Sequence, residues 1–315
     1  MSGLVCLGEI LIDFTPCGKN SQGMALFAQN PGGAPANVLA MNAKLGGRSA
    51  FIGKVGADAF GTFLKQTLES LRIDTTGLVT DPEIPTTLAF VQLDAHGDRS
   101  FTFYRKPGAD LRLTWEDVCK ERIAQCDIFH FGSLSLTDEP CRSATLNALR
   151  YAKFLDKTIS FDPNYRPLLW QDLSTARHWM TAGLREADIV KVSEEEMTLL
   201  TGETDPETGS LRLLEIGPQI VLVTLGADGS YYRNAAGHGR IPACKVHTVD
   251  TTGAGDAFMG AMLWQLNTIP KNELANTVLS PLVTFANAAG GLTTTKPGAI
   301  PALPTLADIQ SSLNK

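Results

Sequence analysis

The sequence predicts an α/β fold, a Rossmann-like three-layer α/β/α domain with a mostly parallel central sheet. From Asp127 onward, short apolar runs typical of buried strands alternate with helical stretches, the runs being 128–131, 157–161, 189–192 and 220–225. Strands separated by helices need right-handed crossovers, so these segments predict one parallel sheet covered on both faces. Two further strand-like runs come before Asp127, with only turn-like residues between them, and predict a hairpin outside that sheet.

Length and composition are those of a globular protein. The 315 residues allow one large domain or two modest ones, and the 43% hydrophobic content is ample for a packed core. The net charge of −6 provides no basic face for nucleic acid. No apolar run approaches the roughly 20 residues that span a bilayer, and the N-terminus lacks the features of a signal peptide. The six cysteines have no metal-binding spacing. We therefore expect a cytoplasmic protein that binds neither nucleic acid nor membrane.

The first predicted element is a buried strand at Leu4–Gly8, and the acid Asp13 follows it closely. Open α/β sheets place ligand-handling groups just beyond the carboxyl ends of their strands. Asp13 is therefore a candidate for contacting a ligand, although a solvated loop acid explains it equally well. The segment 15–29 that follows is polar and has no clear period, so we expect it to be irregular.

A double glycine, Gly32-Gly33, leads into the next predicted helix. Glycines let the backbone approach a ligand closely, Pro35 suits a first helical turn, and Asn37 supplies a donor and an acceptor on the following residues. An ordinary strand-to-helix turn explains the same residues. The glycines at 46–47 are typical of a helix end.

A strand at 50–55 and a helix at 59–71 come next, and then the composition changes. The runs 87–93 and 100–105 are rich in β-branched and aromatic residues, and the turn-like residues 95–98 separate them, which predicts a β-hairpin. Arg105 stands at the end of this hairpin. It is a candidate for reaching a ligand, or one of the many arginines that lie on the surface.

Polar residues follow four strands of the predicted parallel sheet. Because the carboxyl ends of parallel strands meet at one edge, a doubly wound fold brings these groups together along one crevice. The four segments are 132–133, 162–166, 191–196 and 224–229.

The stretch Asp250–Phe258 is the most informative motif of the chain. Gly253, Ala254 and Gly255 leave backbone amides unshielded, and the apolar residues after them recur at helical spacing. The positive end of a helix dipole together with unpaired amides suits an anion, most often a phosphate. Asp256 in this first turn is placed to accept a proton from an attacking hydroxyl, or it serves as a helix-capping acid.

Other nucleotide-binding and catalytic motifs are missing. There is no G-x-x-x-x-G-K-[ST] of a P-loop, and Phe258 stands where a dinucleotide fold has its third glycine. The sequence also contains no H-E-x-x-H and no G-x-S-x-G, so it gives no support to a metalloprotease or an α/β-hydrolase.

Two motifs in the right order resemble the signatures of the ribokinase-like sugar kinases, also called the PfkB family. They are Asp250–Asp256 and Gly32–Asn37, and the similarity covers essentially the whole chain. The resemblance implies one ribokinase-like domain over residues 1–315, with a lid formed by about 11–31 and 86–108. It also implies a possible homodimer, because lids of this family often pair.

The resemblance assigns site residues as well. The positions that match sugar contacts in the family are Asp13, Gly32, Gly33, Asn37, Arg105 and Arg166. Those that match nucleotide contacts are Lys191, Ser193, Glu196, Thr224, Gly226, Gly229 and Asn287. Family members often carry Asn-x-x-Glu at the nucleotide edge. Here Ser193 replaces the asparagine, whereas Glu196 keeps the acid that we expect to hold Mg²⁺ through water.

A monovalent-cation site, suited to K⁺, is the third expectation from the resemblance. Its residues supply mostly backbone carbonyls, and the matching positions are Asp250, Thr252, Ala286, Ala289, Gly291 and Thr295. Carbonyl ligands leave almost no signal in a sequence, so this site depends on the resemblance alone.

The resemblance implies ATP-dependent phosphorylation of a primary hydroxyl of a sugar, with Asp256 as general base and the amides of Gly253, Ala254 and Gly255 neutralising the developing charge. The segments 129–133, 162–166 and 294–304 are most similar to fructokinases, which predicts D-fructose as acceptor and fructose 6-phosphate as product. Ketodeoxygluconate kinases and aminoimidazole riboside kinases are the alternatives. A non-catalytic sugar sensor is less favoured, because Asp256 and both flanking glycines are present.

Overall fold

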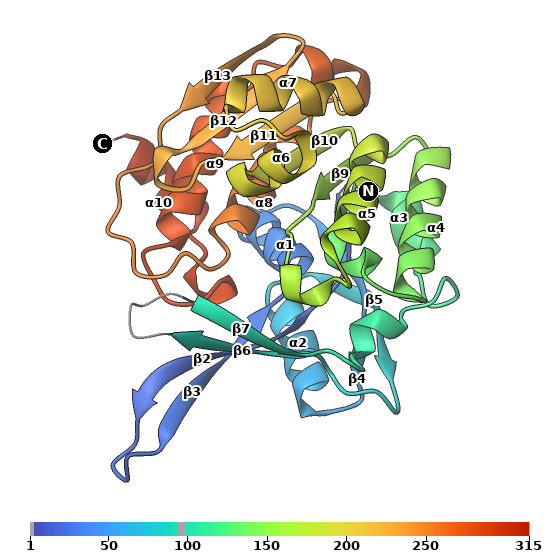
Figure 1. Cartoon of the computed structure of the whole chain (residues 1–315), viewed down its shortest axis with the longest axis vertical. Coiled ribbons are helices and arrows are strands. Elements are labelled where there is room, and N and C mark those ends of the chain that lie inside the picture. Colours follow the sequence, from blue (N-terminus) through green and yellow to red (C-terminus); the bar gives the residue numbers. More distant parts are fainter. Residues whose placement is uncertain (1–2, 94–98, 315) are drawn as a thin grey trace.

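In the computed structural model of the chain, which describes residues 3–93 and 99–314, nine strands form the central sheet (Figure 1). The seven strands from β11 to β5 in the sheet order pair in parallel, and β12 and β13 add an antiparallel edge. In spatial order the strands are β13 (Gly237–Ile241), β12 (Ser230–Asn234), β11 (Ile220–Thr224), β10 (Ile189–Ser193), β9 (Thr158–Asp162), β8 (Ile128–Gly132), β1 (Leu4–Leu7), β4 (Ser49–Gly56) and β5 (Asp74–Asp81).

Helices cover both faces of this sheet, so the predicted three layers are confirmed (Figure 1). Successive strand residues point to opposite faces, and Cys6 and Leu7 of β1 accordingly belong to two separate hydrophobic cores. One core contains α1 (Ala34–Lys44), α2 (Ala59–Ser70), α8 (Ala254–Leu266), α9 (Ser280–Thr293) and α10 (Leu306–Leu313). The other contains α3 (Lys120–Gln125), α4 (Cys141–Phe154), α5 (Leu173–Glu186), α6 (Glu194–Thr201) and α7 (Pro206–Ile216).

The lid is a second sheet of four strands, in the order β3-β2-β6-β7. Its strands are β2 (Leu11–Lys19), β3 (Ala25–Gly32), β6 (Leu88–Leu93) and β7 (Arg99–Tyr104). The predicted hairpin corresponds to β6 and β7 and lies outside the main sheet, as expected. Its turn at 95–98 lies outside the described residues.

One sequence prediction of local structure is wrong, and two strands were not predicted. The segment 15–29 is not irregular, because most of it pairs as β2 and β3; both strands are largely exposed, so they lack the apolar alternation that marks a half-buried strand. Strands β12 and β13 were not predicted; in the edge strand β13, Gly237 and Gly239 weaken the strand pattern. None of the helices in the described ranges has the length and hydropathy of a membrane-spanning segment.

Close packing of α1 against α8 brings the two glycine-containing motifs together. A Cβ added at Gly260 in α8 would lie 2.5 Å from the carbonyl oxygen of Val38 and 2.7 Å from Cβ of Met41, both in α1. Only a glycine allows this approach. As a result Asn37 on α1 and Asp256 on α8, which are 219 residues apart in sequence, lie in direct contact.

Candidate active site

Two cavities meet at the N-terminus of α8. The larger, of about 680 Å³, lies between the lid and the carboxyl ends of the strands and is lined by most of the predicted sugar and phosphate residues: Asp13, Gly33, Asn37, Arg166, Lys191, Ser193, Glu196, Thr224, Thr252, Gly253, Gly255 and Asp256. The smaller, of about 420 Å³, is lined by the predicted nucleotide residues Thr224, Gly226, Gly229 and Asn287. Its lining also includes Ala254 and Gly255, predicted as catalytic, and Gly291, predicted for the monovalent cation. Gly255 and Thr224 line both cavities, so the two cavities adjoin at the N-terminus of α8.

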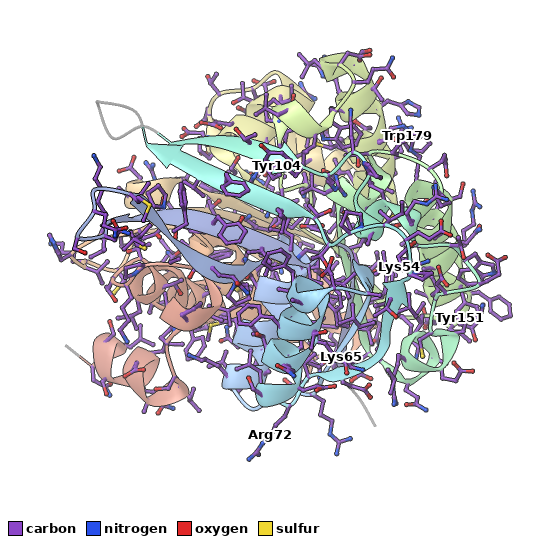
Figure 2. The ribbon with its side chains drawn as sticks, turned by 90° about the horizontal axis from the view of Figure 1, so that it is seen from below. Lys54, Lys65, Arg72, Tyr104, Tyr151 and Trp179 are labelled. Carbon is purple, nitrogen blue, oxygen red and sulfur yellow. The ribbon has the colours of Figure 1, made fainter. Side chains whose placement is uncertain are left out.

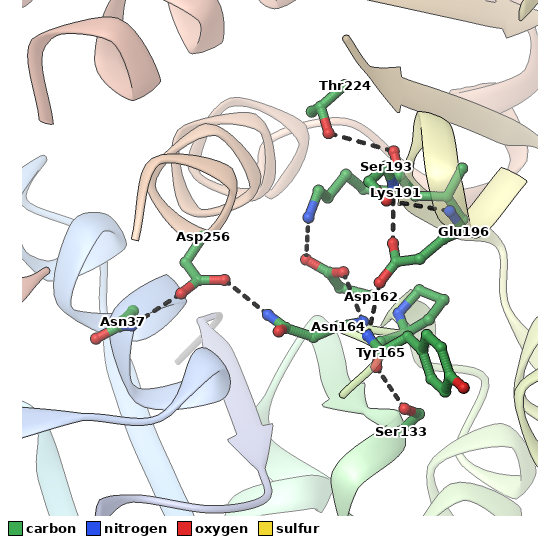
Figure 3. A network of polar contacts seen from close by, with 12 residues as sticks. Asn37, Ser133, Asp162, Asn164, Tyr165, Lys191, Ser193, Glu196, Thr224 and Asp256 are labelled. Atoms are coloured by element: carbon green, nitrogen blue, oxygen red, sulfur yellow. Dashed lines mark hydrogen bonds and ion pairs between the residues drawn. The ribbon is translucent and has the colours of Figure 1, made fainter. Parts of the chain in front are cut away.

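Asp256 lies in the first turn of α8 and is buried, with 7% of its surface exposed. Both of its carboxylate oxygens are held by side-chain amides from other elements (Figure 3). Asn37 Nδ2 donates to Oδ2 at 2.8 Å, and Asn164 Nδ2 donates to Oδ1 at 3.1 Å. These contacts orient the carboxylate toward the larger cavity and do not satisfy the amides of its own helix. The capping interpretation of Asp256 therefore has no support in the geometry.

The pKa of Asp256 is raised, and burial is the cause. The Lys191 ammonium opposes this effect most strongly, followed by the hydrogen bond from Asn37 and the charge of Arg166. The positive end of the helix dipole by itself favours the ionised form of an acid in the first turn. The structure shows that desolvation outweighs the stabilising contacts. A carboxyl group with a raised pKa is a better proton acceptor than an exposed one.

The tip of α8 is built for an anion. Gly253 is the N-cap residue of α8, and its φ of 76° lies in the left-handed region that favours glycine. The N-cap residue makes no side-chain hydrogen bond to the first amides of the helix. The first amides of a helix have no partner within the helix. With a positive helix dipole behind them, these amides face the point where the two cavities join.

A buried ion pair lies next to this tip. Lys191 Nζ of β10 is 2.8 Å from Asp162 Oδ2 at the end of β9, and both side chains are almost fully buried (Figure 3). Burial raises the pKa of Asp162 to about 7 despite the nearby ammonium, whereas the pKa of Lys191 is raised by Asp162, Glu196 and Asp256 against the effect of burial. The lysine therefore stays charged.

Asp13 belongs to the lid strand β2 and lines the larger cavity. Burial raises its pKa to about 7, and the charge of Arg166 partly opposes this. Gly33 has φ of 108°, and a Cβ there would lie 2.5 Å from the carbonyl oxygen of Glu9. The double glycine thus lets the loop pass tightly against the end of β1. Gly32 does not line the cavity, but its backbone packs against the Asp13 carboxylate.

Glu196 and Ser193 form a capping box at the start of α6. Glu196 Oε2 accepts from the Ser193 amide at 2.8 Å, and Oε1 accepts from the Tyr165 amide at 2.6 Å. Ser193 Oγ accepts from the Glu196 amide at 3.1 Å. Serine in place of the family's asparagine therefore serves as the helix cap. Each carboxylate oxygen has a further lone pair, so Glu196 fits the expected water-mediated contact with Mg²⁺, and that contact stays a prediction.

Comparison with known proteins agrees with this geometry. The model of the pfkB family carbohydrate kinases matches residues 1–306. The chain belongs to this family. Fructokinase-1 of Zea mays is 44% identical over 315 residues, which covers 99% of this chain and 98% of the maize protein.

Solved structures of fructokinases have the same fold as this pfkB family kinase. A fructokinase with bound ATP from Xylella fastidiosa superposes with a TM-score of 0.90 at 34% identity, covering 99% of this chain and 98% of that one. A fructokinase from Vibrio cholerae O395, in a form with bound fructose, ADP and calcium ion, superposes with a TM-score of 0.88 at 37% identity and covers 99% of both chains. The expected ribokinase-like fold and kinase activity are thereby confirmed.

Arg105 was predicted to contact the sugar, but its side chain lies outside both cavities. The side chain is buried. The guanidinium donates to Asp110 Oδ2 at 2.7 Å, to the carbonyl oxygen of Leu134 at 2.9 Å and to Thr137 Oγ1 at 3.1 Å. The expected contact between Arg105 and the sugar has no support here, because these acceptors hold the guanidinium inside the protein. It ties the end of the lid to the core.

The residues expected to bind a monovalent cation lie around the loop before α8 and the end of α9. Asp250 accepts from the amides of Thr252 at 2.8 Å and Gly298 at 2.9 Å, and the amides of Val249 and Asp250 donate to the carbonyl oxygen of Thr294. Ala286, Ala289 and Gly291 belong to α9, and Thr295 follows it. Within the described residues no group of three or more acidic, histidine or cysteine side chains is arranged to hold a metal ion. The K⁺ site stays a prediction that rests on carbonyl ligands.

Asn287 and Asn164 contribute to the site in ways that the sequence did not specify. Asn287 accepts from Ser230 Oγ at 2.9 Å and donates to the carbonyl oxygens of Ile241 and Pro242 at 3.1 Å, so it braces the wall of the smaller cavity. Asn164 was not singled out from the sequence. The only available signal was its position in the Asp-Pro-Asn-x-Arg stretch after β9.

Proposed function

We propose that this chain is an ATP-dependent fructokinase, which converts ATP and D-fructose to ADP and D-fructose 6-phosphate. The observation that carries the proposal is the position of Asp256, a buried carboxylate fixed by two amides at the point where the two cavities meet. The larger cavity suits a sugar and the smaller one suits the adenosine part of the nucleotide. The relatives named above are fructokinases, which favours fructose over the two alternative acceptors.

In the proposed mechanism, Asp256 accepts the proton of the C6 hydroxyl of fructose. The sugar oxygen forms a bond to the γ-phosphorus of ATP while the bond from that phosphorus to the β,γ-bridging oxygen breaks, and its electron pair leaves with ADP. The amides at residues 253–255 face the charge on the phosphoryl oxygens. Mg²⁺ at Glu196, through water, supplies charge neutralisation on the nucleotide phosphates when bound.

The polar groups of the lid side orient the sugar. Asp13 accepts from sugar hydroxyls when ionised, and Arg166, whose charge acts on both Asp13 and Asp256, lies across the same cavity. Positioning of the hydroxyl matters more than basicity in a loose phosphoryl-transfer transition state. Asp256 therefore need not be a strong base.

A coupled assay of ADP formation tests this proposal. The purified protein is given ATP, Mg²⁺ and K⁺ with fructose, ribose, 2-keto-3-deoxygluconate or aminoimidazole riboside. We expect the highest kcat/KM with fructose, by at least about tenfold, the scale of one favourable polar contact. A higher value with another acceptor would correct the substrate and keep the reaction type. Absence of turnover with all four would favour the sugar-sensor alternative.

The homodimer through the lid belongs to the same proposal. Leu26, Phe27 and Tyr104 of the lid are exposed by 42%, 44% and 62%, and Figure 2 shows Tyr104 on the outer surface of β7. A second lid covering these side chains would remove them from water. Sedimentation velocity should give a dimer for the wild type and a monomer for Phe27→Lys. A wild type that sediments as a monomer at micromolar concentration would contradict the dimer.

A cytoplasmic location is also proposed. All six cysteines are free thiols, as expected in a reducing compartment. Fractionation of cells that express the protein should place it with cytoplasmic enzymes, and recovery in an organelle or outside the cell would refute this location.

A further inference from the structure

A further cavity lies at the end of the main sheet opposite to the candidate active site. Its volume is about 550 Å³, within the range of about 300–1,000 Å³ that is typical of small-molecule sites. The first residues of β1, β4 and β5 line it, namely Leu4, Ser49 and Asp74. The candidate active site lies beyond the carboxyl ends of the strands. The length of the strands therefore separates this cavity from the proposed reaction.

Three arginines line this cavity, which we call the arginine cavity: Arg48 before β4, Arg72 after α2 and Arg122 in α3. Asp74 is the one carboxylate among the described residues that line it, and it is already paired with Arg122 at 2.7 Å. Arg122 also donates to Thr76 Oγ1 at 3.0 Å, so its guanidinium is held in place. Three guanidinium groups and one carboxylate leave the wall with an excess of positive charge, in a chain whose net charge is −6. A hollow lined by one sign of charge concentrates ions of the opposite sign.

The guanidinium groups of Arg48 and Arg72 are available to a ligand. Both residues are exposed, and across the part of the chain that the structure describes neither side chain has an ion pair or a hydrogen bond. Their backbones, by contrast, are fixed. The carbonyl oxygen of Arg48 accepts from the Leu4 amide at 3.0 Å and from Asn42 Nδ2 at 3.1 Å, and the Arg72 amide donates to the carbonyl oxygen of Glu69 at 2.9 Å. Figure 2 shows the Arg72 side chain extending outward beyond the end of α2, so it belongs to the rim of the cavity.

Arg72 also has an uncommon backbone conformation. Its φ is 60°, and it directly follows Leu71, the C-cap residue of α2. Glycine is the usual residue where a helix ends in this left-handed conformation, and a larger side chain there lowers stability. Backbone strain of this kind is typical of functional positions. The strain at Arg72 is therefore a second observation that favours a function for its side chain.

We propose that the arginine cavity binds a small organic phosphate, a phosphate monoester held between Arg48 and Arg72. The planar guanidinium group pairs with two phosphate oxygens at once, which a carboxylate wall or a single lysine does not offer. The cavity is larger than a phosphate ion, and its wall includes the apolar residues Leu4, Val5 and Ala50, which suit the organic part of the ligand. Because the two arginines come from separate segments of the chain, the bound ligand bridges them and stabilises the folded protein.

Calorimetric titration tests this site. Inorganic phosphate and D-fructose 6-phosphate are each titrated into the wild type in the presence of fructose and ADP, which occupy the proposed active site. The double variant Arg48→Met/Arg72→Gly removes both free guanidinium groups, and because glycine accepts the positive φ, position 72 should not lose stability. We expect the double variant to bind the sugar phosphate at least about tenfold more weakly than the wild type, the effect of losing a charged hydrogen-bond donor. Its kcat should stay within about threefold of the wild-type value.

Lys65→Met is the matched control, because Lys65 is also a cation of α2, paired with Glu69 at 4.0 Å, but does not line the arginine cavity (Figure 2). Its affinity should stay within about twofold of the wild type, since solvent screens a charge outside the site. Phosphate bound at the tip of α8 is retained by the double variant, so the comparison reports the arginine cavity whichever acceptor the kinase uses. No binding by the wild type at millimolar concentration, equal affinity of wild type and double variant, or an equal loss in Lys65→Met would overturn the site. Tighter binding of inorganic phosphate than of the ester would overturn its assignment to an organic phosphate.

Discussion

Asn164 donates a hydrogen bond from Nδ2 to Oδ1 of Asp256 at 3.1 Å, and it does so from a backbone with φ of 47°. Asparagine tolerates this left-handed conformation better than most residues. Asn164 comes two residues after the end of β9, and its backbone amide donates to Asp162 Oδ1. Asn164 thus holds one oxygen of the Asp256 carboxylate, and Asn37 holds the other.

Replacing Asn164 should reduce turnover and change the pH profile. Loss of a hydrogen bond to a charged group corresponds to about 1.5–3 kcal/mol, or roughly 10- to 100-fold in kcat. Because the hydrogen bond lowers the pKa of Asp256, its loss should also move the acid limb of kcat to higher pH. Asn164→Gly tests this most cleanly, since glycine accepts the positive φ and removes only the side chain.

Asn164→Ala provides the comparison, because it adds backbone strain to the same loss. Both variants should lose kcat to a similar extent, whereas the alanine variant should be less stable in urea unfolding. Equal pH profiles for the wild type and Asn164→Gly would contradict the positioning role.

Arg105→Met should reduce stability more than it changes sugar binding. Arg105 and Asp110 form a buried ion pair at 2.6 Å, and removing one partner of such a pair costs about 3–5 kcal/mol in the free energy of unfolding. Since Arg105 does not line the cavity, the KM for fructose of the folded variant should change by less than about threefold, the size of a minor rearrangement. A KM raised by about 100-fold at normal stability would restore the direct contact with the sugar.

Glu9 should make the protein more stable as the pH falls from about 7 to about 4.5, the ordinary pKa of a glutamate. Burial raises the pKa of Glu9 to about 7, one of its oxygens accepts from the Ala34 amide at 3.0 Å, and the other has no partner in the described structure. The folded state therefore keeps a proton that the unfolded chain has lost above pH about 4.5. The resulting stability is fully present below that pH and is lost as the pH rises through about 7.

Glu9→Gln should remove this dependence. The difference in free energy of unfolding between wild type and variant should change by up to about 3 kcal/mol between pH 4.5 and pH 7.5, in the direction that favours the wild type at the lower pH. Urea unfolding at the two pH values measures it. A difference that is the same at both would show that Glu9 is ionised in the folded protein throughout.

Gly260→Ala should loosen the contact between α1 and α8. The added methyl group would lie 2.5 Å from the carbonyl oxygen of Val38, and overpacking of this kind costs about 1–3 kcal/mol. We expect a lower free energy of unfolding and a lower kcat, because Asn37 moves relative to Asp256. A Cβ added at Gly132 would lie 3.4 Å from the backbone carbonyl oxygen of Asp162, which is an ordinary contact. Gly132→Ala should therefore lose much less stability, and equal losses would contradict the packing argument.

Much of the fold was predictable from the sequence, because the central strands are continuous apolar runs with buried residues on both faces. The lid strands β2 and β3 were not, since they are exposed and their pairing depends on partners rather than on an apolar pattern. The edge strand β13 was not predicted because its two glycines weaken the strand pattern.

The site was predictable where the backbone itself requires a residue type. Gly33, Gly253 and Gly255 stand where a side chain would clash or where φ is positive. The hydrogen bonds from Asn37 and Asn164 to Asp256 were not predictable, because contacts between residues 219 and 92 positions apart leave no local pattern. Arg105 shows the opposite case. Its chemistry and its position at the end of the hairpin suit a contact with the sugar, but its guanidinium is already paired with Asp110 inside the protein.

The most direct test of the catalytic arrangement is a crystal structure of the Asp256→Asn variant with ATP, Mg²⁺ and fructose bound. This substitution keeps the shape of the side chain and should slow turnover by about 100-fold or more, so both substrates can be trapped. We predict the γ-phosphate against the amides at residues 253–255, and the C6 hydroxyl of fructose within hydrogen-bond distance of the side chain at position 256. A γ-phosphate bound away from the start of α8, or a sugar whose C6 hydroxyl points elsewhere, would contradict the account.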